Sequence, residues 1–196
     1  MKAIAYDWAG LNEWLYQGFR ALHFSSLDPA WRVLSHGYGY VGAALVVLAL
    51  CARYLMLLHT GRRPQGETLG EILATLVLSF SVVMCALVTI ERLAPLPRPW
   101  YLYEEWMVVQ AFPAWLDGFP SVNATVAVMF ACLFWRHAGK GARRALLAYA
   151  AVGCSLSMVA GLHFPADIAA GALLGAASVW VARWYLRLTA RIMQPA

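Results

Sequence analysis

The stretch that decides the fold is HFPADIAAGALLGAASVWVARWYL, residues 163–186. After Pro165 it is almost wholly apolar, with Asp167 near its start and Arg183 near its end as its only charged side chains. A transmembrane helix needs ~20 predominantly apolar residues, and residues 166–186 reach that length. The stretch therefore predicts a membrane span that opens on polar side chains.

Four further apolar runs precede this one along the chain. They lie at residues 37–58, 69–90, 121–135 and 145–162. The sequence is 62% hydrophobic and only 13% charged, about half of the ~25% charge that is typical of soluble domains. We predict an all-α integral membrane bundle of five transmembrane helices in a single domain, residues 1–196, with the bundle at 36–186 and a cytoplasmic tail at 187–196.

Residues 1–35 form an N-terminal region of a different character. Large apolar side chains recur at helical spacing between residues 4 and 23, with polar residues between them: Trp8, Leu11, Leu15, Phe19 and Leu22. This pattern predicts an amphipathic helix that lies in the membrane interface or packs on the edge of the bundle. Embedded deeply, it would count as a sixth helix. Asp7 and Glu13 follow the start too closely for a signal peptide.

Basic side chains cluster in three segments and predict the topology. The segments 53–71, 136–144 and 183–191 hold ten of the 15 Lys and Arg residues. With five spans, all three segments fall on one side of the membrane, which the positive-inside rule makes cytoplasmic. The net charge of +5 is therefore a topology signal, and we expect no nucleic-acid partner. The loop 91–120 and the turn at residue 163 then lie on the opposite side.

Two of three polar stretches on that opposite side carry groups suited to phosphate. Arg98 stands between two prolines, and its guanidinium could match phosphate oxygens in a fork or merely anchor the chain at the interface. Pro120-Ser121-Val122-Asn123 opens a predicted span. The N–H groups of a helix start attract anions, although the same stretch also suits an ordinary N-cap.

The third stretch is His163-Phe164-Pro165-Ala166-Asp167, which places Asp167 one helical turn beyond His163. A carboxylate at this spacing can accept the proton of one imidazole nitrogen and leave the other nitrogen with a free lone pair. Histidine is also a known covalent nucleophile. The alternative is a capping interaction between two polar residues, but an ionisable pair beside a membrane span favours function.

The order and spacing of these motifs resemble the type-2 phosphatidic-acid phosphatase superfamily, and within it the bacterial undecaprenyl-pyrophosphate phosphatases. The family pattern is a basic residue, six residues and Arg-Pro, then Pro-Ser-Gly-His, then Ser-Arg, five residues, His, three residues and Asp. The resemblance implies that Arg98 and Ser121 bind phosphate, that His163 is the nucleophile and that Asp167 orients it. It also implies a multi-pass protein of the bacterial inner membrane, an extracytoplasmic site, and neither a metal nor another cofactor.

The sequence departs from the family pattern at several site positions. Glu91 stands where the first basic residue belongs, although Arg92 is next to it. Val122 replaces the glycine that approaches phosphate, and Asn123 replaces the histidine that acts as general acid. Ser157 takes the place of a second phosphate-binding arginine. We expect Asn123 and Arg92 to contribute to phosphate binding in a weakened form.

These departures leave two hypotheses about function. Loss of a general acid costs roughly 10²–10⁴ in rate, and loss of an electrostatic donor costs about 10²–10³. The protein is either a weakened lipid phosphatase, acting on or binding an isoprenoid pyrophosphate or a phospholipid phosphate, or a pseudo-phosphatase. The latter would bind a lipid phosphate or serve as an accessory subunit beside a membrane protein partner. A transporter is disfavoured, because the spans lack internal charge and repeats.

Overall fold

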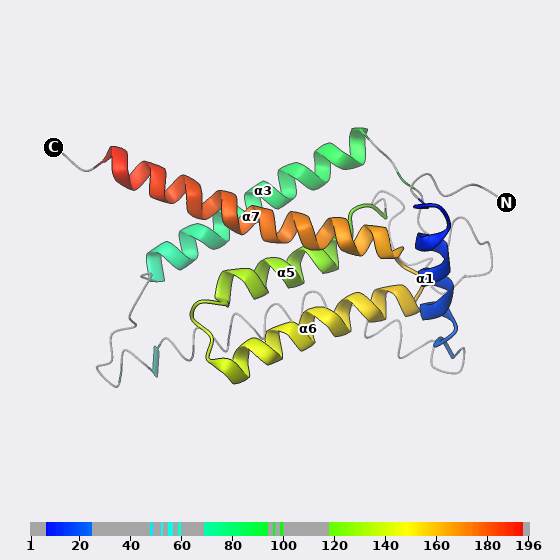
Figure 1. The fold of residues 1–196 in the computed structure, drawn as a ribbon. Coiled ribbons are helices and arrows are strands. Elements are labelled where there is room, and N and C mark those ends of the chain that lie inside the picture. Colours follow the sequence, from blue (N-terminus) through cyan, green and yellow to red (C-terminus); the bar gives the residue numbers. More distant parts are fainter. Residues whose placement is uncertain are drawn as a thin grey trace.

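A computed structural model of the chain describes residues 7–24, 69–93 and 118–193, together with the isolated positions 48, 52, 55, 56, 59, 96 and 99. The elements described in this part of the chain are all helices (Figure 1). They are α1 (Leu11–Arg20), α3 (Leu69–Leu93), α5 (Val122–Phe134), α6 (Lys140–Val159) and α7 (Pro165–Ile192). The all-α prediction is confirmed for these residues.

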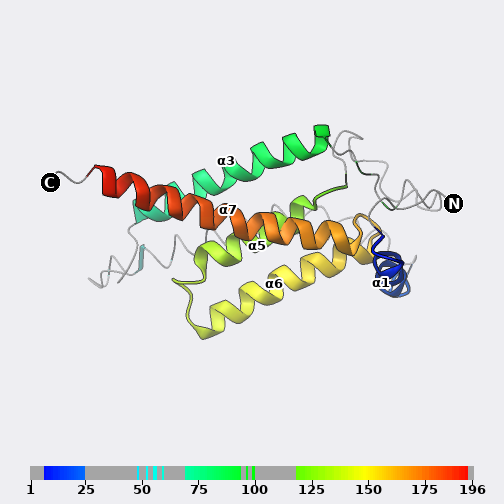
Figure 2. The same cartoon turned by 45° about the horizontal axis from the view of Figure 1, so that its top comes forward.

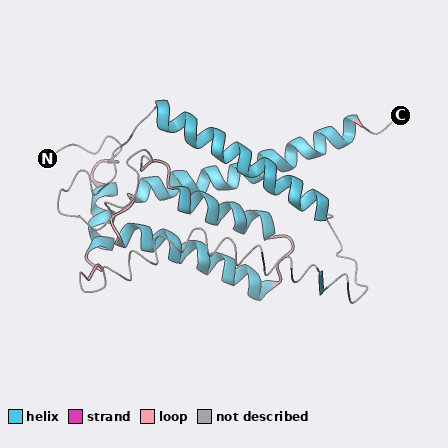
Figure 3. Cartoon of the chain, turned by 180° about the vertical axis from the view of Figure 1, so that it is seen from behind, coloured by secondary structure: helices cyan, strands magenta, loops and turns pink. Residues whose placement is uncertain are grey.

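Helix α7 is the centre of the bundle. It packs against α3, α5 and α1, while α6 packs against α5 and α1. Helices α3 and α7 cross each other, as the two opposite views of Figure 1 and Figure 3 show, and α3 also contacts α5. Helix α1 lies across one end of the bundle, next to the start of α7 (Figure 2). The turn between α6 and α7 is therefore covered by α1.

Four of the predicted spans coincide with described helices. Some of their bounds differ, and these differences have physical reasons. Helix α7 continues to Ile192, beyond the predicted end at residue 186, because no proline or glycine interrupts residues 186–192. Helix α6 begins at Lys140 rather than 145, because its first turn is built from charged residues that the apolar window omits. The predicted span 37–58 lies almost entirely outside the described residues.

Two of the described helices are long and apolar enough to cross a membrane, over Gly70–Leu93 and Pro165–Ile192. These spans support membrane association. Helix α5 has only 13 residues, about 20 Å of helix at 1.5 Å per residue, against a hydrocarbon core of ~30 Å. The predicted count of five spans is therefore not confirmed and stays a prediction.

The predicted amphipathic helix is shorter than residues 4–23. Trp8, Ala9 and Gly10 have left-handed backbone angles, with φ of 55°, 57° and 90°, so the described helix begins at Leu11. The Asp7 carboxylate accepts a hydrogen bond from the Glu13 N–H, with Oδ1 and N 3.1 Å apart, and so closes the first turn. Of the two predicted placements, the structure shows the helix packed on the bundle; its position relative to a membrane stays a prediction.

Two glycines allow α5 and α7 to approach closely. A Cβ atom at Gly171 would lie 2.5 Å from the Ser121 carbonyl oxygen and 3.0 Å from Thr125 Oγ1. A Cβ atom at Gly175 would collide with the Thr125 carbonyl oxygen. Because these residues stand four apart on one face of α7, they set the distance between the starts of α5 and α7.

Replacement of Gly175 by alanine should destabilise the protein by about 1–3 kcal/mol, since the added methyl group overpacks a backbone contact that cannot move cheaply. Gly141 is the matched control, because a Cβ atom at this helical glycine meets nothing within 4 Å. There alanine should be neutral or stabilise the helix by about 0.5–1 kcal/mol. Thermal unfolding in detergent measures both changes, and equal melting temperatures for the two variants would contradict the packing.

Candidate active site

The turn from α6 into α7 carries His163. Helix α6 ends with a pair of backbone hydrogen bonds, from the Gly161 N–H to the Met158 carbonyl at 3.0 Å and from the Leu162 N–H to the Ser157 carbonyl at 2.9 Å. This is the Schellman arrangement, and it requires the left-handed backbone that Gly161 adopts, with φ of 73°. The reversal delivers His163 to the start of α7, where its side chain is only 5% exposed.

The imidazole ring of His163 is held by a backbone carbonyl. Its Nδ1 atom lies 2.8 Å from the carbonyl oxygen of Gly118, 45 residues earlier in the chain. A carbonyl oxygen can only accept, so Nδ1 carries the hydrogen in this contact. In the neutral ring Nε2 is then the unprotonated nitrogen, with a lone pair available for attack.

Asp167 lies beside this ring but its nearest hydrogen bond is to the backbone. Its Oδ2 atom accepts from the Phe164 N–H at 2.7 Å and lies 3.8 Å from His163 Nδ1. We expected the carboxylate to accept the imidazole proton; in the structure the atom at hydrogen-bond distance is the Gly118 carbonyl. Asp167, which is fully buried, holds the turn directly after His163 through its bond with the Phe164 N–H.

The start of α5 meets the start of α7 at this point. The Ser121 N–H donates to the carbonyl oxygen of Asp167 at 3.0 Å. Ser121 is the N-cap of α5, and its buried Oγ atom accepts from the Ala124 N–H at 3.4 Å. A hydroxyl that accepts through one lone pair can still donate its hydrogen. The structure thus brings two of the three predicted stretches together, as their spacing alone could not guarantee.

The remaining predicted site positions differ in burial and in their place in the fold. Val122 and Asn123 are half-buried in the first turn of α5, next to Ser121. Ser157 is buried, and its Oγ atom donates to the Gly153 carbonyl at 2.9 Å.

Two further predicted positions lie in the last turn of α3, where Glu91 is half-buried and Arg92 is exposed. Arg98 lies outside the described residues, although the neighbouring Pro99 is fully buried.

Comparison with known protein families identifies the superfamily of this chain. The family model described as the PAP2 superfamily matches residues 69–190, which is more than half of the chain. The chain belongs to the PAP2 superfamily. The match includes α3, α5, α6 and α7, and the predicted superfamily is confirmed. The resemblance to undecaprenyl-pyrophosphate phosphatases within it stays a prediction.

A solved PAP2-like fold supports the arrangement of the helices. The crystal structure of Aquifex aeolicus LpxE matches with a TM-score of 0.68 and 22% sequence identity, over 94% of this chain and 100% of the LpxE chain. No protein with a curated description matches the sequence. PAP2 membership supports a lipid phosphatase, and the likeness to LpxE supports the fold.

Sequence reasoning missed the Gly118 carbonyl. A backbone oxygen carries no residue signature, and Gly118 lies just before the Pro-Ser motif that attracted attention. The only available signal was its place next to that motif, because the Pro-Ser stretch was expected to meet the stretch that holds His163.

The two roles of Asp167 can be separated by two substitutions. Asp167→Ala removes the acceptor of the buried Phe164 N–H and should destabilise the protein by about 1–3 kcal/mol, the cost of an unsatisfied buried donor. Asp167→Asn keeps an acceptor oxygen and should lose clearly less. Denaturant or thermal unfolding in detergent measures the difference. Equal losses in both variants would show that the bond to Phe164 does not hold the turn.

Proposed function

We propose that this PAP2 protein removes the terminal phosphate from an isoprenoid pyrophosphate, such as undecaprenyl pyrophosphate, at the extracytoplasmic face of a bacterial inner membrane. The observation that carries the proposal is the 2.8 Å contact between His163 Nδ1 and the Gly118 carbonyl. It leaves Nε2 as a nucleophile of defined tautomer within a PAP2 fold. A phospholipid phosphate is the other substrate class that this chemistry admits.

The reaction proceeds in two displacements at phosphorus. The lone pair of His163 Nε2 forms a bond to the terminal phosphorus, and the bond to the bridging oxygen breaks, so that the lipid monophosphate leaves with that oxygen. Water then attacks the phosphohistidine, the N–P bond breaks with its electron pair returning to Nε2, and inorganic phosphate is released. Asp167 stabilises the positive charge that develops on the ring during the first step.

The leaving group explains the preference for a pyrophosphate. Asn123 stands where a PAP2 general acid belongs, and an amide can donate a hydrogen bond but cannot supply a proton. An alkoxide leaving from a lipid monophosphate needs protonation, whereas a phosphate ester leaving from a pyrophosphate is far less basic. In this proposal Ser121, Asn123, Arg92 and Arg98 bind the phosphate oxygens, and Arg98 supplies the principal charge.

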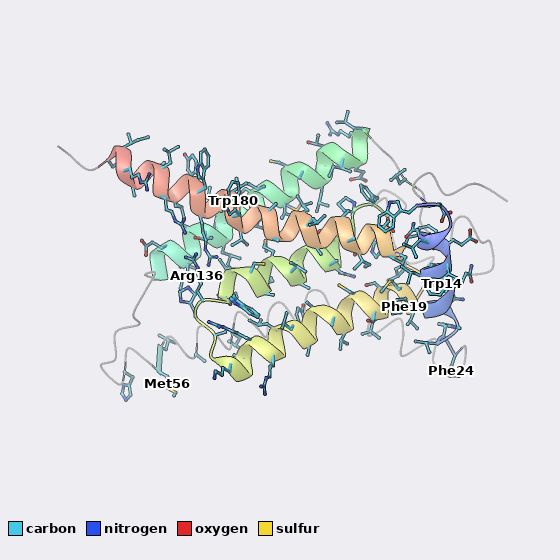
Figure 4. The ribbon with its side chains drawn as sticks, in the orientation of Figure 1. Trp14, Phe19, Phe24, Met56, Arg136 and Trp180 are labelled. Atoms are coloured by element: carbon cyan, nitrogen blue, oxygen red, sulfur yellow. The ribbon has the colours of Figure 1, made fainter. Side chains whose placement is uncertain are left out.

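The membrane orientation follows from the length and charge of α7. Asp167 and Arg191 are separated by roughly 36 Å along a helix that rises 1.5 Å per residue, more than the ~30 Å of a hydrocarbon core. Arg183 of α7 donates to the carbonyl oxygens of Cys132 and Leu133 near the end of α5, and Figure 4 labels Arg136, in the turn that follows α5, at the end of the bundle away from Trp14. The positive-inside rule then favours a cytoplasmic C-terminus and an extracytoplasmic His163.

A pseudo-phosphatase is the second candidate, and the environment of Ser157 favours it. This position carries a phosphate-binding arginine in the family pattern, but here it is a buried serine bonded within its own helix. A site with fewer cations could retain lipid-phosphate binding after hydrolysis is lost, as an accessory subunit of a membrane complex would require.

Phosphate release from purified protein decides between the two functions. We expect release from undecaprenyl pyrophosphate to exceed release from phosphatidic acid under the same detergent conditions. No release from either lipid, together with measurable binding of the pyrophosphate lipid, would establish the pseudo-phosphatase instead.

A further inference from the structure

One face of α1 lies along the turn that carries His163. Asn12, Tyr16 and Arg20 stand four residues apart and therefore share a face of the helix. They contact the turn in reverse order: Asn12 contacts Ala166, Tyr16 contacts Phe164, and Arg20 contacts Val159. The chain before and after His163 is thus held by one short helix more than 130 residues away in sequence.

Asn12 makes the contact nearest the start of α7. Its side chain is fully buried, and its Oδ1 atom accepts a hydrogen bond from the Ala166 N–H at 2.9 Å. The N–H groups in the first turn of a helix have no partner within that helix. Asn12 therefore caps α7 from another helix, while the Asp167 carboxylate accepts from Phe164 within the same turn.

Tyr16 and Arg20 extend this contact. The Tyr16 ring packs on the ring of Phe164, directly after His163, with centroids 4.9 Å apart. Burial raises the pKa of Tyr16 to about 12, against a smaller lowering by the nearby Arg20, so its hydroxyl stays protonated at neutral pH. Arg20 Nη1 donates to the carbonyl oxygen of Val159, the last residue of α6, at 3.2 Å.

We propose that Asn12 is a positioning residue for His163, acting through the backbone of Ala166 and the first turn of α7. The contact between His163 and Gly118 joins the turn before α7 to the segment that leads into α5. A shift of the first turn of α7 relative to that segment would lengthen it. The imidazole of His163 would then no longer be fixed in one tautomer, and its Nε2 atom would no longer be oriented towards the phosphorus. A displacement of about 1 Å at a reacting group can cost roughly 10²-fold in rate. This inference rests on the proposed function, but the state of the ring can be observed without turnover.

Three variants test the role of Asn12 in the full-length protein. Asn12→Leu keeps the size of the side chain but removes the acceptor, and Asn12→Asp retains an acceptor oxygen. Gln17→Leu is the matched control, because Gln17 is exposed on the same helix. The readout is ¹⁵N NMR of the imidazole rings at mildly alkaline pH, with the His163 signal identified by its loss in His163→Ala.

In the parent protein and in Gln17→Leu, we expect one His163 nitrogen with a protonated shift and the other with an unprotonated shift. Asn12→Leu should average the two shifts, and Asn12→Asp should restore their separation. In turnover with undecaprenyl pyrophosphate, Asn12→Leu should lower kcat by roughly 10–10²-fold with little change in KM. A merely structural role for Asn12 would alter the amount of folded protein without changing the ring shifts.

An unchanged His163 spectrum in folded Asn12→Leu, or equal impairment of Asn12→Asp and Asn12→Leu, would overturn the inference. If Asn12→Leu does not fold, Asn12→Gln takes its place, because the longer side chain displaces the acceptor oxygen from Ala166. If the parent protein releases no phosphate, the proposed function fails while the ring shifts still decide the role of Asn12.

Discussion

Replacement of His163 by alanine is expected to lower phosphate release from undecaprenyl pyrophosphate by roughly 10³-fold or more, because loss of a covalent nucleophile removes the whole displacement sequence. The loss should appear in kcat, since the phosphate ligands that we propose remain in place. The folded state should survive, because the ring makes its described hydrogen bond at the end of the bundle and not in the apolar core between α3, α5 and α7.

His137→Ala provides the control for this experiment. His137 follows α5, in the turn that leads to α6. This turn lies at the opposite end of the bundle from the turn between α6 and α7 (Figure 1). Release from this variant should match the parent. Activity that survives in His163→Ala would exclude a phosphohistidine route, even if the parent protein proves to be an efficient phosphatase.

Asn123→His is expected to raise hydrolysis of a lipid monophosphate by roughly 10²-fold, within the range that a positioned general acid supplies. The position is half-buried in the first turn of α5, directly after Ser121 and Val122, so an imidazole there keeps access to solvent. Release from a pyrophosphate lipid should rise much less, because its leaving group needs little protonation. The measurement is the ratio of release rates for phosphatidic acid and undecaprenyl pyrophosphate in parent and variant.

A control for this prediction is Asn123→Gln, which lengthens the amide without adding an acid and should leave the ratio unchanged. An equal gain for both lipids in Asn123→His would mean that the histidine acts by binding and not by protonation. No gain at all would show that the start of α5 is not aimed at the leaving group.

An arginine at residue 157, where the family pattern has its second phosphate-binding arginine, would meet a different environment. Ser157 is 2% exposed and bonded within α6, and a guanidinium placed there would be buried unless the surrounding helices moved. Burial of an unpaired charge is costly. The structure therefore indicates that the packing of α6 closes position 157 to a charged side chain, whereas position 123 is half-buried.

Most of the described helices could be predicted from the sequence, because a sufficiently long apolar run indicates a helix. The helices α3, α5 and α7 begin within about one residue of the predicted spans. The predicted start of the N-terminal helix was wrong, because the three residues before Leu11 have left-handed backbone angles. Helical periodicity does not reveal such angles. The end of α7 was missed for a simpler reason, since hydropathy falls at its arginines while helix propensity does not.

Only the side-chain groups of the candidate site could be predicted from the sequence. His163, Asp167 and Ser121 could be found from residue type and spacing, and the backbone bond between Ser121 and Asp167 agrees with the predicted meeting of their two stretches. The Gly118 carbonyl could not be found in this way, because every residue has one. The contact of Asn12 with Ala166 was equally hidden, since a single sequence gives no signal for a pair 154 residues apart.

Detection of a phosphoryl-enzyme intermediate would show directly whether His163 is the nucleophile. Undecaprenyl pyrophosphate labelled in its terminal phosphate is mixed with the protein, turnover is stopped in alkali within milliseconds, and the peptides are analysed by mass spectrometry. We expect a phosphoryl group on Nε2 of His163, stable to base and labile to acid, and its absence in His163→Ala. Release of phosphate with no such adduct at any time, or an adduct on Ser121, would contradict this expectation.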